Sequence, residues 1–153
     1  MIIADTSPLN YLILIDAVEI LPKLFQEIVI PDAVQQELLA PGATEKVRQW
    51  ADKAPPWLKV RTVETIDETI RLGRGEIEAI SLTAELSADA ILLDDKAARL
   101  AARKRNIKVI GTLGLLKLAD ENKLIDFKVA VKRLQSTNFR VSKVVIEKLL
   151  DHY

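Results

Sequence analysis

Short apolar segments, each three or four residues long, alternate along the chain with longer segments of helical pattern. The clearest of them are Ile2–Ala4, Ile28–Ile30 and Ala90–Leu93, and the last is an uninterrupted apolar run. Such a run is typical of a strand that is covered on both faces. Strands that alternate with helices favour a mostly parallel sheet with helices on both sides. We therefore predict an α/β fold with three layers, α/β/α, and a single domain over residues 1–153.

Proline, glycine and capping residues mark the ends of the predicted helices. Ser7 and Pro8 begin the first one, because serine caps helices and proline suits the first helical position. Glu76–Leu86 carries the clearest helical pattern. The domain core is expected within about residues 1–120 and a helical extension within about 121–153. Further strands are predicted over 58–61 and 108–110, and further helices over 31–39, 44–53, 64–72, 96–105, 113–121, 126–134 and 142–150.

The residue types that are missing exclude several kinds of chemistry. The chain has no cysteine and a single histidine, His152, close to the end of the sequence. Disulfides, thiolate zinc sites and cysteine nucleophiles are therefore excluded. A lone histidine in a terminal segment does not support a Ser-His-Asp triad or a His-rich metal site. Any chemistry must be carried by Asp and Glu.

The charge and hydropathy patterns limit the possible partners. Lys and Arg number 22 and balance 22 Asp and Glu, so contact with a nucleic acid would depend on a local patch or on metal ions. No apolar run reaches the roughly 18–20 residues that span a bilayer. The opening segment lacks the basic region and cleavage site of a signal peptide. We expect a cytoplasmic location without membrane contact.

Five carboxylates are expected at one edge of the sheet. Asp5 follows the first predicted strand, Asp94 and Asp95 follow the long apolar run, Glu76 begins a helix, and Glu37 lies in the helix after the second strand. In parallel α/β sheets ligands bind at the carboxyl ends of the strands. Converging carboxylates repel each other, and divalent cations relieve that repulsion. Oxygen ligands without His or Cys select Mg²⁺ or Mn²⁺, so the pattern predicts a metal-dependent catalytic site.

Each of these acids also has a simpler interpretation. Asp5 alone is more often a turn or cap residue, and Glu76 alone is more often a partner of the helix dipole. Glu37 alone is usually a solvated helix residue, and Asp94 with Asp95 could form a plain turn. The metal-site prediction therefore depends on the joint pattern of acids at the same edge.

Basic residues follow the acidic pair. Lys96, Arg99 and Arg103 lie along one face of a predicted helix, at spacings of three and four. We predict that they hold phosphates of a nucleic acid, together with Arg74, which lies between two glycines. The alternative is a solvated helix face. No aromatic residues are interleaved with the basic ones, so base stacking is not supported.

Four segments resemble the PIN-domain proteins, and within them a prokaryotic branch related to VapC-type toxins. The segments read "IIADTSPLNYL", "IPDAVQQEL", "GRGEIEAISLTAEL" and "ILLDDKAARLAARKRNIKVIGTLGLL", and the resemblance covers roughly residues 1–120. PIN domains are metal-dependent ribonucleases with a parallel sheet flanked by helices. The resemblance implies that members dimerise and are neutralised by a small antitoxin protein that fills the groove.

The resemblance also assigns site residues. The family's small hydroxyl residue after the first acid corresponds to Thr6 or Ser7, and we place Ser7 at the substrate. The family more often has Asp as its third acid, so Glu76 is a departure, and Glu78, which points to another helix face, would be in the second shell or exposed. Whether Glu76 or Glu78 is the third acid stays open. The acidic quartet maps onto Asp5, Glu37, Glu76 and Asp94 with Asp95 beside it, and Asp5, Glu76 and Asp94 are expected to bind the metal.

Our hypothesis is a Mg²⁺- or Mn²⁺-dependent ribonuclease that prefers single-stranded RNA and is the toxin of a toxin–antitoxin pair. A second reading is a degenerate PIN-like domain that binds RNA or a protein partner without cutting, although the chain keeps all of the acids. A third is a phosphoryl-transfer receiver domain. Receivers carry the acidic pair after the first strand, whereas here the single Asp5 comes first and the pair comes late.

Overall fold

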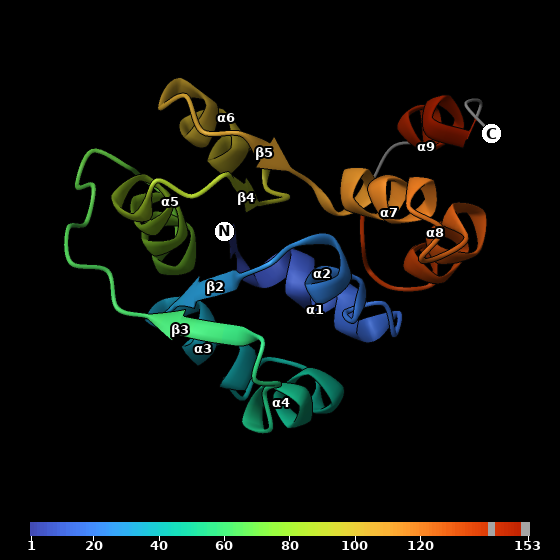
Figure 1. The fold of residues 1–153 in the computed structure, drawn as a ribbon, viewed down its shortest axis with the longest axis horizontal. Helices are drawn as coiled ribbons and strands as arrows, with labels where there is room; N and C mark the ends of the chain where they lie inside the picture. Colours follow the sequence, from blue (N-terminus) through green and yellow to red (C-terminus); the bar gives the residue numbers. More distant parts are fainter. Residues whose placement is uncertain (141–142, 151–153) are drawn as a thin grey trace.

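The computed structural model describes residues 1–140 and 143–150, which form a central parallel sheet covered by helices on both sides (Figure 1). The sheet has the strand order β3-β2-β1-β4-β5, and every neighbouring pair is parallel. The predicted α/β/α architecture is therefore confirmed. The strands are β1 (Ile2–Ala4), β2 (Ile28–Pro31), β3 (Leu58–Arg61), β4 (Ala90–Leu92) and β5 (Val109–Ile110).

Helices lie on both faces of the sheet because alternate strand residues point to opposite sides. Ile2 and Ala4 of β1 belong to one apolar cluster, whereas Ile3 between them belongs to the other. The first cluster is completed by α1 (Thr6–Leu14), α2 (Ile20–Leu24), α3 (Asp32–Leu39), α4 (Glu45–Asp52), α7 (Thr112–Glu121) and α8 (Phe127–Gln135). The second is completed by α5 (Arg74–Leu86) and α6 (Lys96–Lys104), and α9 (Lys143–Leu150) follows α8.

The sheet register brings the ends of β1 and β4 together. Ala4 pairs with Leu92, and the Asp5 N–H donates to the Leu92 carbonyl at 3.0 Å. The chain leaves β1 toward β2 on one side, and β4 later joins β1 on the other, so the strand order reverses beside β1. This topological switch point is where open α/β sheets bind ligands.

The first helix begins one residue before the predicted cap. Thr6 is its first residue, so Asp5 occupies the N-cap position and the prediction that Ser7 caps the helix is wrong. Asp5 has an extended backbone, as N-cap residues do, but its side chain makes no capping hydrogen bond. The carboxylate therefore remains available at the end of β1.

The segment 64–72 is not a helix, which corrects the prediction made for it. The Asp67 side chain accepts hydrogen bonds from the Thr69 N–H at 3.0 Å and the Thr69 hydroxyl at 2.5 Å. Glu85 of α5 accepts from two further N–H groups of the segment, at 2.8 and 2.9 Å. These side-chain acceptors compete with the backbone carbonyls that a helix would use.

The helices predicted over 31–39, 44–53, 96–105, 113–121 and 126–134 hold to within one residue at each end. Glu76 is the third residue of α5 rather than the first, because the helix already begins at Arg74. His152, and the predicted helix start at Ser142, lie outside the described residues. Over 1–140 and 143–150, no helix has the length and apolar character that crossing a bilayer requires.

Candidate active site

Three of the predicted acids line one cleft of about 340 Å³ beyond the end of β1, called here the Asp5 cleft. Asp5 comes from the end of β1, Glu37 from the second half of α3 and Glu76 from the first turn of α5. The remaining lining residues are Thr6, Ser7, Asn10, Tyr11, Gly73 and Gly75. The fold thus assembles carboxylates from three elements that are far apart in the sequence.

Asp5 lies at the bottom of this cleft in an unfavourable electrostatic environment. Asp5 is only 5% exposed, and its Oδ1 is buried without a hydrogen-bond partner among the described residues. Burial is the largest of the causes that raise the pKa of Asp5 to about 7, and the Thr6 backbone N–H opposes the shift. The nearby carboxylates, those of Glu76, Glu37 and Asp94, raise the pKa further. Asp5 is therefore a carboxylate that lacks a counter-charge.

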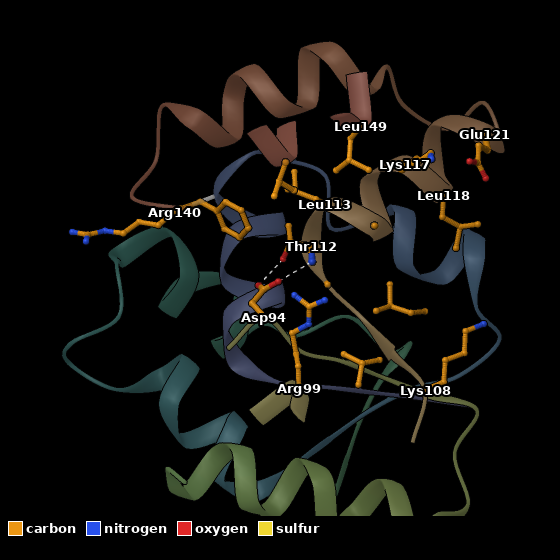
Figure 2. Close-up of a pocket in the computed structure, with 16 residues that line it drawn as sticks. Asp94, Arg99, Lys108, Thr112, Leu113, Lys117, Leu118, Glu121, Arg140 and Leu149 are labelled. Atoms are coloured by element: carbon orange, nitrogen blue, oxygen red, sulfur yellow. Dashed lines mark hydrogen bonds between the residues drawn. The ribbon is translucent and has the colours of Figure 1, made fainter. Parts of the chain in front are cut away.

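Asp94, at the end of β4, is held by three hydrogen bonds. The Thr112 N–H donates to Oδ1 at 2.8 Å and the Thr112 hydroxyl donates to Oδ2 at 2.7 Å, as the dashed lines in Figure 2 show. Ser7 donates its hydroxyl to Oδ2 at 3.1 Å. Thr112 is fully buried and is the first residue of α7, so the start of this helix fixes the position of the carboxylate. Sequence reasoning missed Thr112.

The carboxylate of Glu37 rests against a glycine. A Cβ placed on Gly75 would lie 1.9 Å from Glu37 Oε1, a distance that no side chain permits. The Thr6 hydroxyl donates to the same oxygen at 3.0 Å. Gly75 in the first turn of α5 therefore provides the space that lets α3 bring Glu37 to the cleft. Sequence reasoning treated this glycine only as a helix breaker.

Glu76 and Asp95 make different use of helix N-termini. Glu76 Oε1 accepts from the Gly73 N–H at 3.3 Å. Its pKa is raised by burial first and then by Asp95 and Glu37, against the Gly73 N–H. Asp95 is the N-cap of α6 and accepts from the Ala98 N–H at 3.0 Å. Asp95 is exposed and does not line the Asp5 cleft. Its contact in the structure is the cap of α6, not a group of the candidate site.

Glu78 faces away from the cleft, toward the beginning of α3. It is buried, accepts from the Ala33 N–H at 3.1 Å and pairs with Arg74 Nε at 2.5 Å. It therefore supports the packing of α3 on α5, and it is not exposed. The Arg74 side chain is mostly exposed and is directed to this pair, not to the lining of the cleft.

The basic residues of α6 separate into two environments. Lys96 and Arg103 are exposed. Arg99 is half-buried, and it lines a second and larger cavity together with Asp94. Of the three, Arg99 therefore shares a cavity with Asp94, whereas Lys96 and Arg103 line neither this cavity nor the Asp5 cleft.

The donor set of the Asp5 cleft fits a hard divalent cation. Carboxylate oxygens without nitrogen or sulfur ligands match Mg²⁺ or Mn²⁺, and the unpartnered Oδ1 of Asp5 is an acceptor with nothing to bind. Within the described part of the chain, no three or more His, Cys, Asp or Glu are already arranged as a metal site. Hydroxyl and N–H groups hold the carboxylates of Glu37, Glu76 and Asp94 instead.

Comparison with known proteins gives three findings. A family model described as PIN domain matches residues 1–153. Among solved structures, a PilT N-terminus domain protein from the hyperthermophilic archaeon Sulfolobus solfataricus P2 is similar, with a TM-score of 0.50 and 14% sequence identity over 92% of this chain and 100% of that chain. At this identity the likeness concerns the fold alone. No curated protein matches the chain.

Proposed function

Because the chain belongs to the PIN-domain family, we propose that it is a divalent-metal-dependent ribonuclease whose active site is the Asp5 cleft. Membership implies a nuclease-type function, the hydrolysis of phosphodiester bonds. The finer assignment to RNA and to Mg²⁺ or Mn²⁺ is our proposal. The observation that carries it is the buried, unpartnered carboxylate of Asp5 beside two further acids.

In this proposal Asp5 and Glu76 hold the cation from the Asp5 cleft, and Asp94, which lines the neighbouring cavity, completes the ligand set. A bound Mg²⁺ or Mn²⁺ would supply Lewis-acid stabilisation of charge on the phosphodiester and would favour ionisation of nearby water. It would also offset the repulsion between an acidic cleft and a polyanionic substrate. The hydrogen bonds from Thr112 and Ser7 would orient Asp94 before the cation binds.

The remaining residues would act on water and phosphates. Glu37 has an exposed carboxylate in the cleft and is oriented by Thr6, so it would position the attacking water and accept its proton. Asp95 would contribute negative charge near Glu76. The groups assigned to the phosphates of the substrate are Ser7, Arg74, Lys96, Arg99 and Arg103.

The test is cleavage of a labelled single-stranded RNA by the purified protein with Mg²⁺, with Mn²⁺ and with EDTA. We expect metal-dependent cutting that Asp5→Asn reduces by about a thousandfold or more, since a ligand and a charge are both lost. Asp52→Asn, an exposed acid in the last turn of α4, is the matched control and should cut at the normal rate. Full metal-dependent cleavage by Asp5→Asn would refute the site assignment.

We further propose that the protein is the toxin of a toxin–antitoxin pair, acts in the cytoplasm as a homodimer, and is neutralised by a small antitoxin protein. Support for this comes from the sequence resemblance to VapC-type toxins. Induced expression should arrest growth, and expression of Asp5→Asn at the same level should not. Equal arrest by both proteins would contradict the toxin role.

A further inference from the structure

A cavity of about 640 Å³ adjoins the Asp5 cleft on the side of Asp94, and we call it the Asp94 cavity (Figure 2). It lies between α6, β5 and α7 and is bounded by the segment 139–140 and by α9. Its size falls in the range of small-molecule sites, about 300–1,000 Å³. Asp94 lines this cavity at one end and accepts a hydrogen bond from Ser7, which lines the Asp5 cleft.

The two spaces also share an aromatic wall. Tyr11 lines the Asp5 cleft, and its ring packs edge-to-face on Phe139, which lines the Asp94 cavity, with ring centroids 4.8 Å apart. The Tyr11 hydroxyl donates to Asn138 Oδ1 at 2.8 Å. The segment that follows α8 is thereby fixed beside the candidate active site. An RNA strand that left the active site past Asp94 would enter the Asp94 cavity.

The charges around the cavity favour an anionic occupant. Arg99, Lys108, Lys117 and Arg140 line it, against the two acids Asp94 and Glu121. Figure 2 shows Arg140 and Lys108 extending toward opposite sides, with Arg99 next to Asp94. The Arg140 guanidinium points away from the other lining residues in this view, so Arg99, Lys108 and Lys117 are the cations available to successive phosphates of an RNA strand.

Arg99 has an unused donor at the inner end of the cavity. Its Nε is buried and has no hydrogen-bond partner among the described residues. A Cβ on Gly111 would lie 3.5 Å from Asp94 Oδ1 and 4.0 Å from Arg99 Nη1, so both groups lie over the same glycine. They nevertheless form no ion pair within 4.0 Å. A buried donor without a partner is unfavourable. Because Arg99 lines the cavity, its guanidinium group is placed to donate charge-assisted hydrogen bonds to a phosphate there.

Apolar side chains form the floor of the same cavity. Leu113, Leu118, Phe139 and Leu149 line it from α7, the segment after α8, and α9. An unstacked base can lie on such a surface, because single-stranded RNA can turn its bases outward toward apolar and aromatic side chains. A paired base cannot, since it remains inside the duplex.

We propose that the Asp94 cavity binds one unpaired nucleotide of the RNA strand next to the cleaved phosphodiester, with a phosphate on Arg99 and the base on the apolar floor. This inference rests on the proposed nuclease function and adds a substrate site to it. It also gives a physical reason for a preference for single strands. An acidic peptide could use the same cations, but the continuity with the Asp5 cleft through Ser7 and Asp94 favours the nucleotide.

The experiment measures binding of a fluorescently labelled single-stranded RNA in EDTA, so that cleavage does not interfere. We expect Arg99→Gln to weaken binding about tenfold, the loss of one charge-assisted phosphate contact. The dependence of log Kd on log salt should become shallower by about one. Lys117→Gln, at the far end of the cavity, should weaken binding less. Lys104→Gln, an exposed cation at the end of α6 outside the cavity, is the matched control and should bind normally.

A 2-aminopurine base in the RNA reports on the floor of the cavity, and its fluorescence should change on binding to the wild type and not when the RNA is in a duplex. One outcome would overturn the proposal: the wild type cuts RNA, but Arg99→Gln and Lys117→Gln bind RNA as tightly as the control Lys104→Gln. The Asp94 cavity is then not a nucleotide site, and an acidic peptide becomes the better occupant. If the folded wild type neither binds nor cuts single-stranded RNA, the proposed function itself is wrong. Thermal unfolding of each variant shows whether it is folded.

Discussion

Asp5 and Asp94 end neighbouring strands of the same sheet, yet their surroundings differ sharply. Asp94 accepts three hydrogen bonds, two from Thr112 and one from Ser7. Asp5 is more deeply buried, has an oxygen with no partner, and has a pKa raised to about 7. The fold fixes the carboxylate of Asp94 by hydrogen bonds, whereas burial of the Asp5 carboxylate lowers the stability of the folded state when that carboxylate is ionised.

The difference indicates which half of the site depends on a cation. A buried carboxylate without a partner destabilises the folded state unless it is protonated or paired with a positive charge. Asp94 already has donors, so a cation would change its energy less. We therefore expect metal binding to be coupled to the ionisation of Asp5 and the position of Asp94 to be set by the protein. The following predictions, in order of expected effect on stability, test this contrast.

The largest effect should be a loss of stability of the metal-free protein as the pH rises. The pKa of Asp5 goes from 3.8 in the unfolded chain to about 7 in the fold, so the native state binds more protons between these values. The unfolding free energy should therefore fall as pH rises from about 4 to about 7, by about 4 kcal/mol at most from this group. Glu76, whose pKa is also raised, changes stability in the same direction. Chemical denaturation at pH 5 and pH 8 measures the difference.

Excess Mg²⁺ or Mn²⁺ should recover much of this loss at pH 8 and little at pH 5, because the cation binds the ionised site. In Asp5→Asn both the pH dependence and the metal effect should be strongly reduced, and the metal-free variant should be more stable than the wild type at pH 8. Asp67, with a pKa lowered to about 2, changes stability only at more acidic pH, so it does not interfere. A wild type that becomes more stable from pH 5 to 8 without metal would contradict the account of Asp5.

The next effect concerns Thr112, which holds Asp94. Thr112→Val keeps the shape of this fully buried side chain but removes the hydroxyl donor to Asp94 Oδ2. We expect a loss of about 1–3 kcal/mol in unfolding free energy and slower RNA cleavage. Thr112→Ser should restore the cleavage rate more than the stability, because it returns the donor without the methyl group. Equal cleavage by Thr112→Val and the wild type would show that this bond does not orient Asp94 for catalysis.

The same contrast explains how far sequence reasoning could go. The strands and their parallel direction follow from short apolar runs that alternate with helices, and in a parallel sheet Asp5 and Asp94 must then lie at the same edge. The strand order, which makes β1 and β4 neighbours, comes only from the structure. Whether an acid at a strand end is a cap or a free carboxylate is decided by local backbone geometry. Asp5 and Asp95 both occupy N-cap positions, but only Asp95 accepts the capping hydrogen bond. No pattern in the sequence separates the two.

Contacts between elements that are distant in the chain also could not be predicted from the sequence. The role of Thr112 depends on α7 starting beside β4, and the burial of Glu78 depends on the packing of α3 against α5. The helix predicted over 64–72 failed because acceptors from α5 captured its N–H groups, a tertiary effect that local propensity does not contain. The prediction that a hydroxyl residue next to Asp5 serves the site came from the family resemblance, and both Thr6 and Ser7 line the cleft.

The smallest effect on stability should come from Gly75→Ala. Alanine favours a helix over glycine by about 1 kcal/mol, but its Cβ would collide with the Glu37 carboxylate, 1.9 Å away. That carboxylate is the end of a flexible side chain at an exposed position, so it can move aside at little cost. We therefore expect almost no net change in unfolding free energy, together with weaker Mn²⁺ binding and slower cleavage. Titration calorimetry and denaturation measure the two quantities separately.

Glu37→Gln is the matched comparison, because it removes the charge without moving the side chain. If Gly75→Ala and Glu37→Gln weaken cleavage alike, the glycine acts through the position of Glu37. A marked loss of stability in Gly75→Ala would instead mean that the first turn of α5 had shifted, since Glu76 and its bond from the Gly73 N–H lie in the same turn. In that case the space at Gly75 would serve the packing of α3 on α5 rather than the placement of one carboxylate.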